Sequence, residues 1–146
     1  SGWSWSYEIS DGNWEIDEPK RLLNNFFSEL FKQYTSKNVY VLGFSQGGLV
    51  CFDFVLYLDQ PLGGVFPICG FLRQPKIDKK RFHPCQKNTP ILIGHGKYDD
   101  KVPVKASKNA YGLLKKQEAN VELFLYNGKH KIGMDFMKKV KEIIQL

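Results

Sequence analysis

Three side chains that could act together on an acyl group stand far apart in the sequence: a serine, an aspartate and a histidine. Ser45 is the centre of GFSQG, a Gly-x-Ser-x-Gly pentapeptide. Asp99 and Asp100 lie in GHGKYDDKVP, and His130 lies in NGKHKIG. A serine hydroxyl becomes an effective nucleophile when a histidine takes its proton and a carboxylate holds the imidazole in place. The set therefore predicts acyl transfer through Ser45, with His130 as the base and one of the two aspartates as the acid that orients it.

The glycines on either side of Ser45 indicate a sharp turn that exposes the serine. Where a strand ends and a helix begins at such a pentapeptide, small residues two positions away let the two backbones pass, and the serine takes a strained conformation. The backbone N–H of Gln46 then aims at the same point from the first turn of the helix, as an oxyanion donor. A glycine-rich phosphate loop is the alternative, but it would need more glycines or a lysine in place of Gly48.

Apolar periodicity and turn residues predict the elements that must position these groups. The predicted strands cover residues 39–42, 63–68, 90–94 and 121–126. The predicted helices cover residues 18–35, 46–57, 104–117 and 132–145, and the first of these has one strongly apolar face. A long basic loop is predicted for residues 70–89, with a helical turn near 78–82.

This alternation of strands and helices predicts an α/β fold, a three-layer α/β/α arrangement around a mostly parallel sheet with right-handed crossovers. Ligands of such sheets bind at the carboxyl ends of the strands. Ser45, the aspartate pair and His130 each follow a different predicted strand, in the chain order that serine nucleophiles of this architecture use. We therefore expect the three groups to meet at one end of the sheet, within a single domain that covers residues 1–146.

The overall composition argues against two classes of partner. Lys and Arg outnumber Asp and Glu by 21 to 15, which gives a net charge of +6 and an isoelectric point near 9.2. The lysines are dispersed over the solvent faces of the predicted helices, so we expect no nucleic-acid partner. No apolar run approaches the roughly 20 residues of a membrane span, so we expect no stable membrane insertion.

The cysteines and the other histidines show no metal-binding pattern. Cys51, Cys69 and Cys85 have no CxxC spacing, which argues against a disulfide framework or a zinc site and fits a reducing compartment. Cys51 and Cys69 are predicted to be buried free thiols. His95 follows a buried strand, so we expect it to make a structural hydrogen bond. His83 has no further ligands nearby, and we expect no metal there.

Four segments closely resemble the phospholipase/carboxylesterase group of α/β-hydrolases, which includes the acyl-protein thioesterases: GFSQGG, LGGVFPICGFL, PILIGHGKYDDKVP and LYNGKHKIG. The resemblance runs from about residue 38 to the end of the chain. It implies an α/β-hydrolase fold and a carboxylesterase, lysophospholipase or acyl-thioesterase that cleaves small-molecule esters or thioesters without metal or cofactor. It also implies a cytoplasmic homodimer, as many members are. Aligned on the family's His-Gly-x-x-Asp-x-x-Val-Pro loop, the acid is Asp99 rather than Asp100.

The resemblance also implies strands that would precede residue 1, so the chain looks like an N-terminally truncated hydrolase fold. The strand at residues 39–42 would then be a bare apolar edge, which favours aggregation or strand exchange. We expect this edge to form a homodimer or to pair with a missing N-terminal segment that carries the second oxyanion N–H. The loss of one such donor typically costs ~10²- to 10³-fold in rate.

Two features leave alternatives open at this point. Phe71 and Leu72, just after the second predicted strand, are candidate walls of an acyl pocket, and core packing explains them equally well. A peptidase or a lactone hydrolase could use the same three residues as an esterase. A catalytically inactive binding domain, or a truncated fragment, would keep the fold and lack the chemistry.

Overall fold

The computed structural model describes residues 8–10, 13–14, 17–73 and 79–145. Its centre is a parallel sheet of four strands whose spatial order equals their order in the chain. These strands are β3 (Tyr40–Phe44), β4 (Gly64–Ile68), β5 (Ile91–Gly96) and β6 (Val121–Tyr126). A separate antiparallel pair is formed by β1 (Glu8–Ser10) and β2 (Asn13–Trp14).

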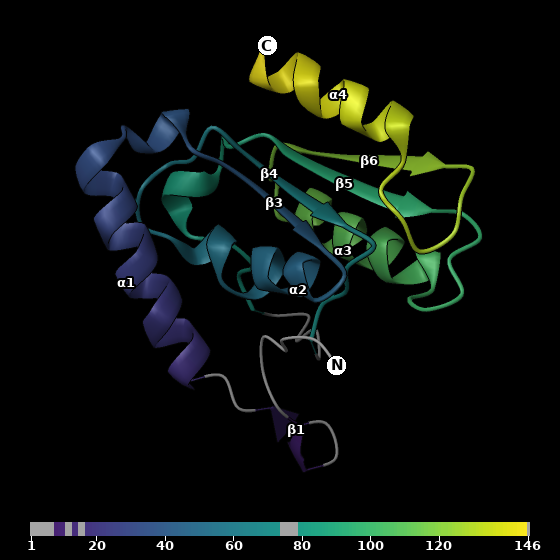
Figure 1. The fold of residues 1–146 in the computed structure, drawn as a ribbon, viewed down its shortest axis with the longest axis horizontal. Helices are drawn as coiled ribbons and strands as arrows, with labels where there is room; N and C mark the ends of the chain where they lie inside the picture. The colour runs from purple at the N-terminus through teal and green to yellow at the C-terminus, as the bar shows by residue number, and fades with distance from the viewer. Residues whose placement is uncertain (1–7, 11–12, 15–16, 74–78, 146) are drawn as a thin grey trace.

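Helices cover both faces of the parallel sheet, as Figure 1 shows. On one side lie α1 (Asp17–Gln33), α2 (Gln46–Asp53) and α3 (Val104–Lys116), and on the other lies α4 (Met134–Ile144). Short 3₁₀ turns occupy the connections: η1 (Ser36–Asn38), η2 (Val55–Tyr57) and η3 (Pro84–Gln86). The predicted three-layer α/β/α arrangement is confirmed.

Two apolar cores flank the sheet, one on each face. The core beneath α1, α2 and α3 includes Phe52, Leu56 and Ile93, and the core beneath α4 includes Phe66 and Phe136. Every residue of β4 and β5 is buried, because these central strands have a strand on each side and helices above and below. Near-continuous apolar runs such as PILIG are the sequence signature of this position.

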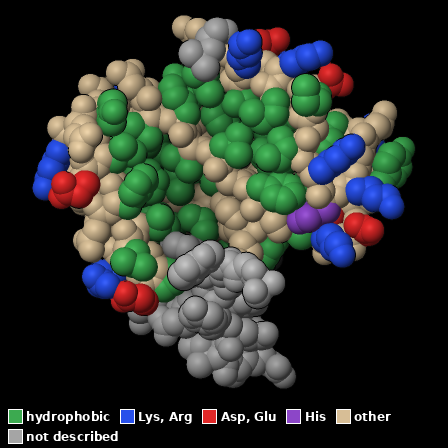
Figure 2. Space-filling model, viewed as in Figure 1, with side chains coloured by type: hydrophobic (Ala, Val, Ile, Leu, Met, Phe, Trp, Pro, Cys, Tyr) green, Lys and Arg blue, Asp and Glu red, His purple; other side chains and the backbone are tan. Residues whose placement is uncertain are grey.

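β3 forms an open edge, because no strand of the described residues pairs with its outer side. Leu42 is 41% exposed there, and on α1 the side chains of Leu22 and Phe26 are 55% and 58% exposed. Figure 2 shows hydrophobic side chains gathered over this face of the molecule. The apolar edge expected from the sequence is present, and the apolar face of α1 is only partly covered, mainly at Phe27.

The helix predicted for residues 46–57 is too long. α2 ends at Asp53, and Phe54 departs from helical geometry with φ −130° and ψ −58° before η2 begins. Phe54, Val55 and Leu56 are all buried. A segment that is apolar on all sides has no polar face, so its sequence does not reveal where the helix stops.

The helical turn predicted near residues 78–82 lies later in the chain. Residue 78 is outside the described residues, and residues 79–82 are not helical. The turn forms instead at η3, where Pro84 occupies the first position and His83 Nδ1 accepts a hydrogen bond from the Cys85 N–H at 3.1 Å. Proline at the first helical position and a capping side chain before it are ordinary start signals.

Within the part of the chain that the structure describes, no helix combines the length and the apolar character needed to cross a membrane.

Candidate active site

Ser45 stands between the end of β3 and the start of α2, at the carboxyl end of the sheet. Its φ of 58° and ψ of −111° lie in a region that a non-glycine residue occupies only at a cost of ~1–3 kcal/mol. The Ser45 N–H donates to the Ile68 carbonyl at 2.8 Å, and the Ser45 carbonyl accepts from the Gly48 N–H at 2.9 Å. The strained conformation predicted for this serine is confirmed.

The sequence predicts that Gly43 and Gly47 are needed for close packing at this turn. The structure shows close backbone packing at Gly43 and Gly48 instead. A Cβ on Gly43 would lie 2.1 Å from the Gly47 carbonyl oxygen, so glycine lets β3 and α2 pass. A Cβ on Gly47 would meet no atom within 4 Å, so the expectation that Gly47 is required for space is wrong. The crowded position on α2 is Gly48, whose Cβ would lie 2.8 Å from Gly70 Cα.

His130 and Asp99 reach Ser45 from two other strand ends. His130 lies in the loop after β6, and its Nε2 is 3.0 Å from Ser45 Oγ. Its Nδ1 is 2.7 Å from an oxygen of Asp99, which lies in the loop after β5. The Phe44 ring packs against the imidazole, with ring centres 4.8 Å apart. With the ring proton on Nδ1, Asp99 accepts from His130 and Ser45 donates to Nε2, so the three side chains form one hydrogen-bonded chain.

Asp99 is held as an ionised acceptor. Its Oδ1 accepts hydrogen bonds from the backbone N–H groups of Lys101 at 2.8 Å and Val102 at 2.9 Å, and Oδ2 faces His130. Burial alone would raise the pKa of Asp99. The hydrogen bonds from His130 and from the two backbone N–H groups outweigh burial and lower the pKa to about 2. Asp100 is exposed, so the geometry favours Asp99 as the acid.

A second histidine supports the loop that carries Asp99. His95, near the end of β5, is fully buried. Its Nδ1 lies 2.6 Å from Ser107 Oγ, and its Nε2 lies 2.8 Å from the Val102 carbonyl oxygen. The same Nε2 is 3.2 Å from Asp99 Oδ2. The structural hydrogen bond predicted for His95 is present, but nothing in the sequence indicated that the ring also approaches the carboxylate.

Cys69 is a neighbour of this site that the sequence did not reveal. It follows β4, is fully buried as predicted, and has φ 49°. Its Sγ is 3.4 Å from the Tyr126 hydroxyl, which donates a hydrogen bond to the Lys131 carbonyl. Burial raises the pKa of both the Cys69 thiol and the Tyr126 phenol. The Cys69 sulfur also lies within 4.8 Å of a carboxylate oxygen of Asp99 and of a ring nitrogen of His130.

The other residues predicted for the site differ in how well their positions suit it. Gln46 is the first residue of α2, so its backbone N–H belongs to the first turn, at the positive end of the helix dipole. Phe71 is half-buried and directly follows Gly70, which packs on α2. Leu72 packs against the core beneath α1, α2 and α3. Core packing therefore accounts for Leu72, and Phe71 stays a candidate pocket wall.

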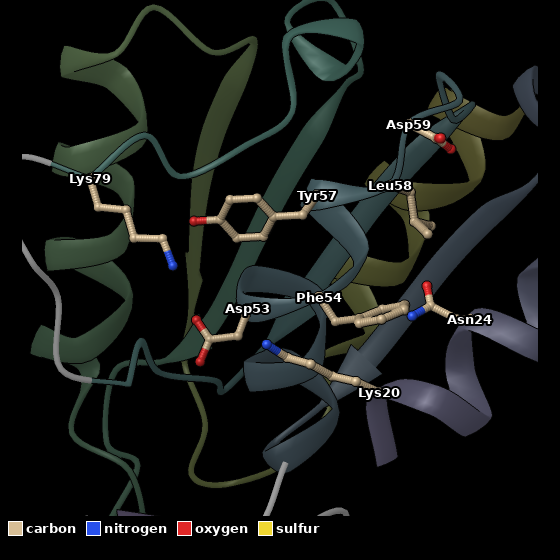
Figure 3. Close-up of a pocket in the computed structure, with 8 residues that line it drawn as sticks. All are labelled: Lys20, Asn24, Asp53, Phe54, Tyr57, Leu58, Asp59 and Lys79. Atoms are coloured by element: carbon tan, nitrogen blue, oxygen red, sulfur yellow. The ribbon is translucent and has the colours of Figure 1, made fainter. Parts of the chain in front are cut away.

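A cavity of about 510 Å³ lies elsewhere, between α1 and the segment from α2 to η2. Figure 3 shows the side chains of Lys20 and Lys79 directed toward Asp53 from two sides. Asp53 is also paired with Arg81 at 2.8 Å. None of Ser45, Asp99 and His130 lines this cavity, so it is distinct from the candidate active site.

The chain matches known hydrolases in sequence. A model of the phospholipase/carboxylesterase family matches residues 4–146. Acyl-protein thioesterase 1 of Kluyveromyces lactis is 29% identical over 103 residues, which cover 69% of this chain and 45% of that protein. Carboxylesterase SOBER1 of Arabidopsis thaliana is 30% identical over 118 residues, 80% of this chain and 52% of that protein. An Oryza sativa protein named as a probable inactive carboxylesterase is 30% identical over 91 residues, 62% of this chain and 37% of that protein.

The chain also matches a solved structure. The crystal structure of Arabidopsis thaliana SOBER1 superposes with a TM-score of 0.76 at 28% identity, and the match covers 88% of this chain and 62% of that chain. The chain spans about half the length of the curated relatives it matches. Because the family match covers nearly all of the residues and the solved structure shares the fold, the chain belongs to the phospholipase/carboxylesterase family of α/β-hydrolases.

Proposed function

We propose that the chain carries the catalytic centre of a serine hydrolase that cleaves carboxylic esters or thioesters through an acyl-enzyme. The observation that supports this most is the hydrogen-bonded chain from Ser45 Oγ through His130 to Asp99, at 3.0 Å and 2.7 Å. Three separate strand ends are needed to build it, and each supplies a different one of the three groups that the reaction requires.

In the proposed reaction, Ser45 Oγ attacks the carbonyl carbon while His130 Nε2 takes the hydroxyl proton. Asp99 stays ionised and stabilises the imidazolium that forms, which its low pKa of about 2 permits near neutral pH. His130 then gives its proton to the leaving alcohol or thiol. A water molecule repeats the sequence on the acyl-enzyme and returns Ser45 to its starting state.

The negative charge on the carbonyl oxygen needs donors that are already in place. We assign the first to the backbone N–H of Gln46, because it directly follows Ser45 and opens α2. We propose that a second donor comes from polypeptide outside the described residues, which would pair with the open edge of β3, either as a second copy or as further chain.

The substrate class rests on the relatives and on one side chain. Their names include a carboxylesterase and an acyl-protein thioesterase, so we infer an ester or thioester of a carboxylic acid. Phe71, half-buried beside the turn, is the proposed apolar contact for the acyl chain. The mechanism draws only on protein groups and water.

A fluorophosphonate probe and a p-nitrophenyl ester test the proposal together. An activated serine reacts rapidly with the probe, so we expect labelling at Ser45 and hydrolysis of the ester. Ser45→Ala should lose both, with a fall of ~10⁶-fold in kcat. A Ser45→Ala protein that kept most of its esterase activity would refute the assignment. Parallel assays on peptide amides and on lactones separate the esterase from a peptidase or lactone hydrolase.

The second candidate function is an inactive binding domain with the same fold. One relative is itself named as a probable inactive carboxylesterase, and the chain spans about half of its relatives' length. An absence of fluorophosphonate labelling in a cooperatively folded protein would favour this candidate.

We also propose that residues 1–146 act as one domain and that the protein works in the cytoplasm. Both cores are built on the same parallel sheet, which favours one cooperative unit. All three cysteines are free thiols, which suits a reducing compartment.

A further inference from the structure

Three groups that can ligate Zn²⁺ meet beside the proposed nucleophile. The Cys69 thiol sulfur, a carboxylate oxygen of Asp99 and a ring nitrogen of His130 all lie within 4.8 Å of one another. They follow β4, β5 and β6, which are neighbouring strands of the sheet. Ligands drawn from three strand ends leave no CxxC or similar spacing in the sequence, which is why the sequence argued against a metal site.

The donor set suits Zn²⁺. Catalytic-type zinc sites use three protein ligands drawn from thiolate, imidazole and carboxylate, at roughly 2.0–2.3 Å, with a fourth position open to water. Those bond lengths place the ligand atoms of a tetrahedral site roughly 3.3–3.6 Å apart. The Asp99–His130 separation of 2.7 Å would have to widen, and the most distant pair, within 4.8 Å, would have to close by roughly 1 Å. Side-chain rotation supplies movements of this size.

The ligand atoms have hydrogen-bonding neighbours that a bound cation would partly replace: Asp99 Oδ2 lies 3.2 Å from His95 Nε2, and Cys69 Sγ lies 3.4 Å from the Tyr126 hydroxyl. The backbone N–H groups of Lys101 and Val102 hold Asp99 Oδ1, so Oδ2 is the oxygen directed at the cluster. Outer contacts of this kind orient a metal ligand. The side chains of Asp99 and Cys69 are buried, whereas that of His130 is 18% exposed, so the imidazole is the part of the cluster that is in contact with solvent.

We propose that Cys69, Asp99 and His130 form an inhibitory site for a thiophilic divalent cation, with Zn²⁺ as its representative. The binding depends only on the cluster, whereas the inhibition rests on the proposed hydrolase function. The bound cation takes the lone pair of His130 Nδ1, the thiol gives its proton to solvent, and the proton of the neutral ring resides on Nε2. A protonated Nε2 cannot accept the proton of Ser45, so the metal-bound protein does not form the acyl-enzyme.

Co²⁺ tests this site without reference to catalysis, because a thiolate ligand gives Co²⁺ an intense near-ultraviolet charge-transfer band. The full chain, kept reduced with a phosphine rather than a thiol, is titrated with CoCl₂. We expect one equivalent to bind with this band and to be displaced by Zn²⁺. Ester hydrolysis should fall with added Zn²⁺ and return with EDTA. The absence of the band in the wild-type protein would overturn the proposal.

Two serine variants identify the ligand. Cys69→Ser removes the soft donor and nearly preserves the side-chain size, so it should lose the band and bind Co²⁺ at least ~10- to 100-fold more weakly, the loss typical of an outer-shell partner. Cys85→Ser is the matched control. The Cys85 thiol donates to the Leu58 carbonyl and is not one of the three proposed ligands, so this variant should keep the band. A band that survives in Cys69→Ser, or disappears in Cys85→Ser, would assign the metal elsewhere and overturn the proposal.

A third variant guards against a folding defect in Cys69→Ser. His130→Ala keeps the thiol and removes a partly exposed ligand, so it should fold and lose Co²⁺ affinity by a similar factor. Unchanged affinity in His130→Ala would overturn the site. Hydrolysis that is absent from metal-free wild-type protein would count against the proposed function alone, because the cobalt spectrum is read independently of it.

Discussion

His130 Nε2 lies 3.0 Å from Ser45 Oγ, although the two residues follow opposite edge strands of the four-stranded sheet. Ser45 comes after β3 and His130 after β6, so the loop that carries His130 must return across the ends of β5 and β4. Asp99, which follows β5, binds the ring along this path. The Ser45–His130 hydrogen bond therefore depends on the register of the whole sheet.

Asp99→Asn should lower kcat for ester hydrolysis by ~10⁴-fold, as removal of the charge does in other serine hydrolases with this arrangement. The asparagine oxygen can still accept from the Lys101 and Val102 N–H groups, so the loop should keep its shape. Its amide group would then face His130 Nδ1 and impose the wrong tautomer on the ring. Steady-state kinetics with a p-nitrophenyl ester measures the loss.

The neighbouring aspartate provides the control. Asp100→Asn changes the same residue type one position along, on an exposed side chain, and should leave kcat unaltered. A larger loss in Asp100→Asn than in Asp99→Asn would mean that the acid has been assigned to the wrong residue.

Asp99 should also make stability depend on acid pH. A carboxyl whose pKa is lower in the folded than in the unfolded protein stabilises the fold fully above its unfolded value of about 3.9. This contribution is lost as the pH falls through the folded value of about 2. Urea unfolding of the wild type and Asp99→Asn, in EDTA, should show a difference in unfolding free energy that is constant above about pH 5 and shrinks toward pH 2. A difference that grows on acidification would contradict this pKa.

Replacement by alanine should destabilise the protein at Gly48 and stabilise it at Gly47. The Cβ of Gly48→Ala would lie 2.8 Å from Gly70 Cα, so α2 or the loop after β4 must shift, at a cost of about 1–3 kcal/mol. Gly47→Ala meets no atom within 4 Å and should raise helix stability by up to about 1 kcal/mol. Thermal unfolding of both variants tests the pair, and equal destabilisation of the two would show that the close approach of Gly48 and Gly70 is not limiting.

At Ser45, glycine should give a more stable folded protein than alanine does. Glycine relieves the backbone strain at φ 58°, which stabilises the folded protein by ~1–3 kcal/mol. The greater freedom of glycine in the unfolded chain offsets about 0.5–1 kcal/mol of this gain. Ser45→Gly should therefore be more stable than Ser45→Ala by about 1 kcal/mol in chemical denaturation, although both lack the nucleophile. An alanine variant that is the more stable of the two would argue that the backbone at this turn is relaxed.

The sequence predicts the parts of this structure that depend on local pattern. Alternating apolar segments indicated every strand of the parallel sheet, and the chain order of Ser45, Asp99 and His130 indicated which strand ends must meet. What the sequence left out depends on contacts between segments. The approach of His95 and Cys69 to Asp99 is set by how three loops pack, and no spacing of residues encodes it. The role of Gly48 depends in the same way on Gly70 of another loop.

The open edge of β3 should drive self-association of this chain, and Leu42→Lys should weaken it. The Val39 carbonyl accepts from Gly63 and the Ser45 N–H donates to Ile68, so the odd-numbered residues of this segment bond to β4. In a parallel strand the alternate residues point the other way, and the N–H and C=O groups of Leu42 therefore face outward. A lysine at a half-exposed edge position keeps its charge in water and discourages pairing with another strand.

Light scattering over a range of protein concentrations measures the change in self-association. Leu22→Lys, on the exposed face of α1, is the matched control, and an equal effect of the two substitutions would place the association on the apolar surface of α1 instead of the strand edge.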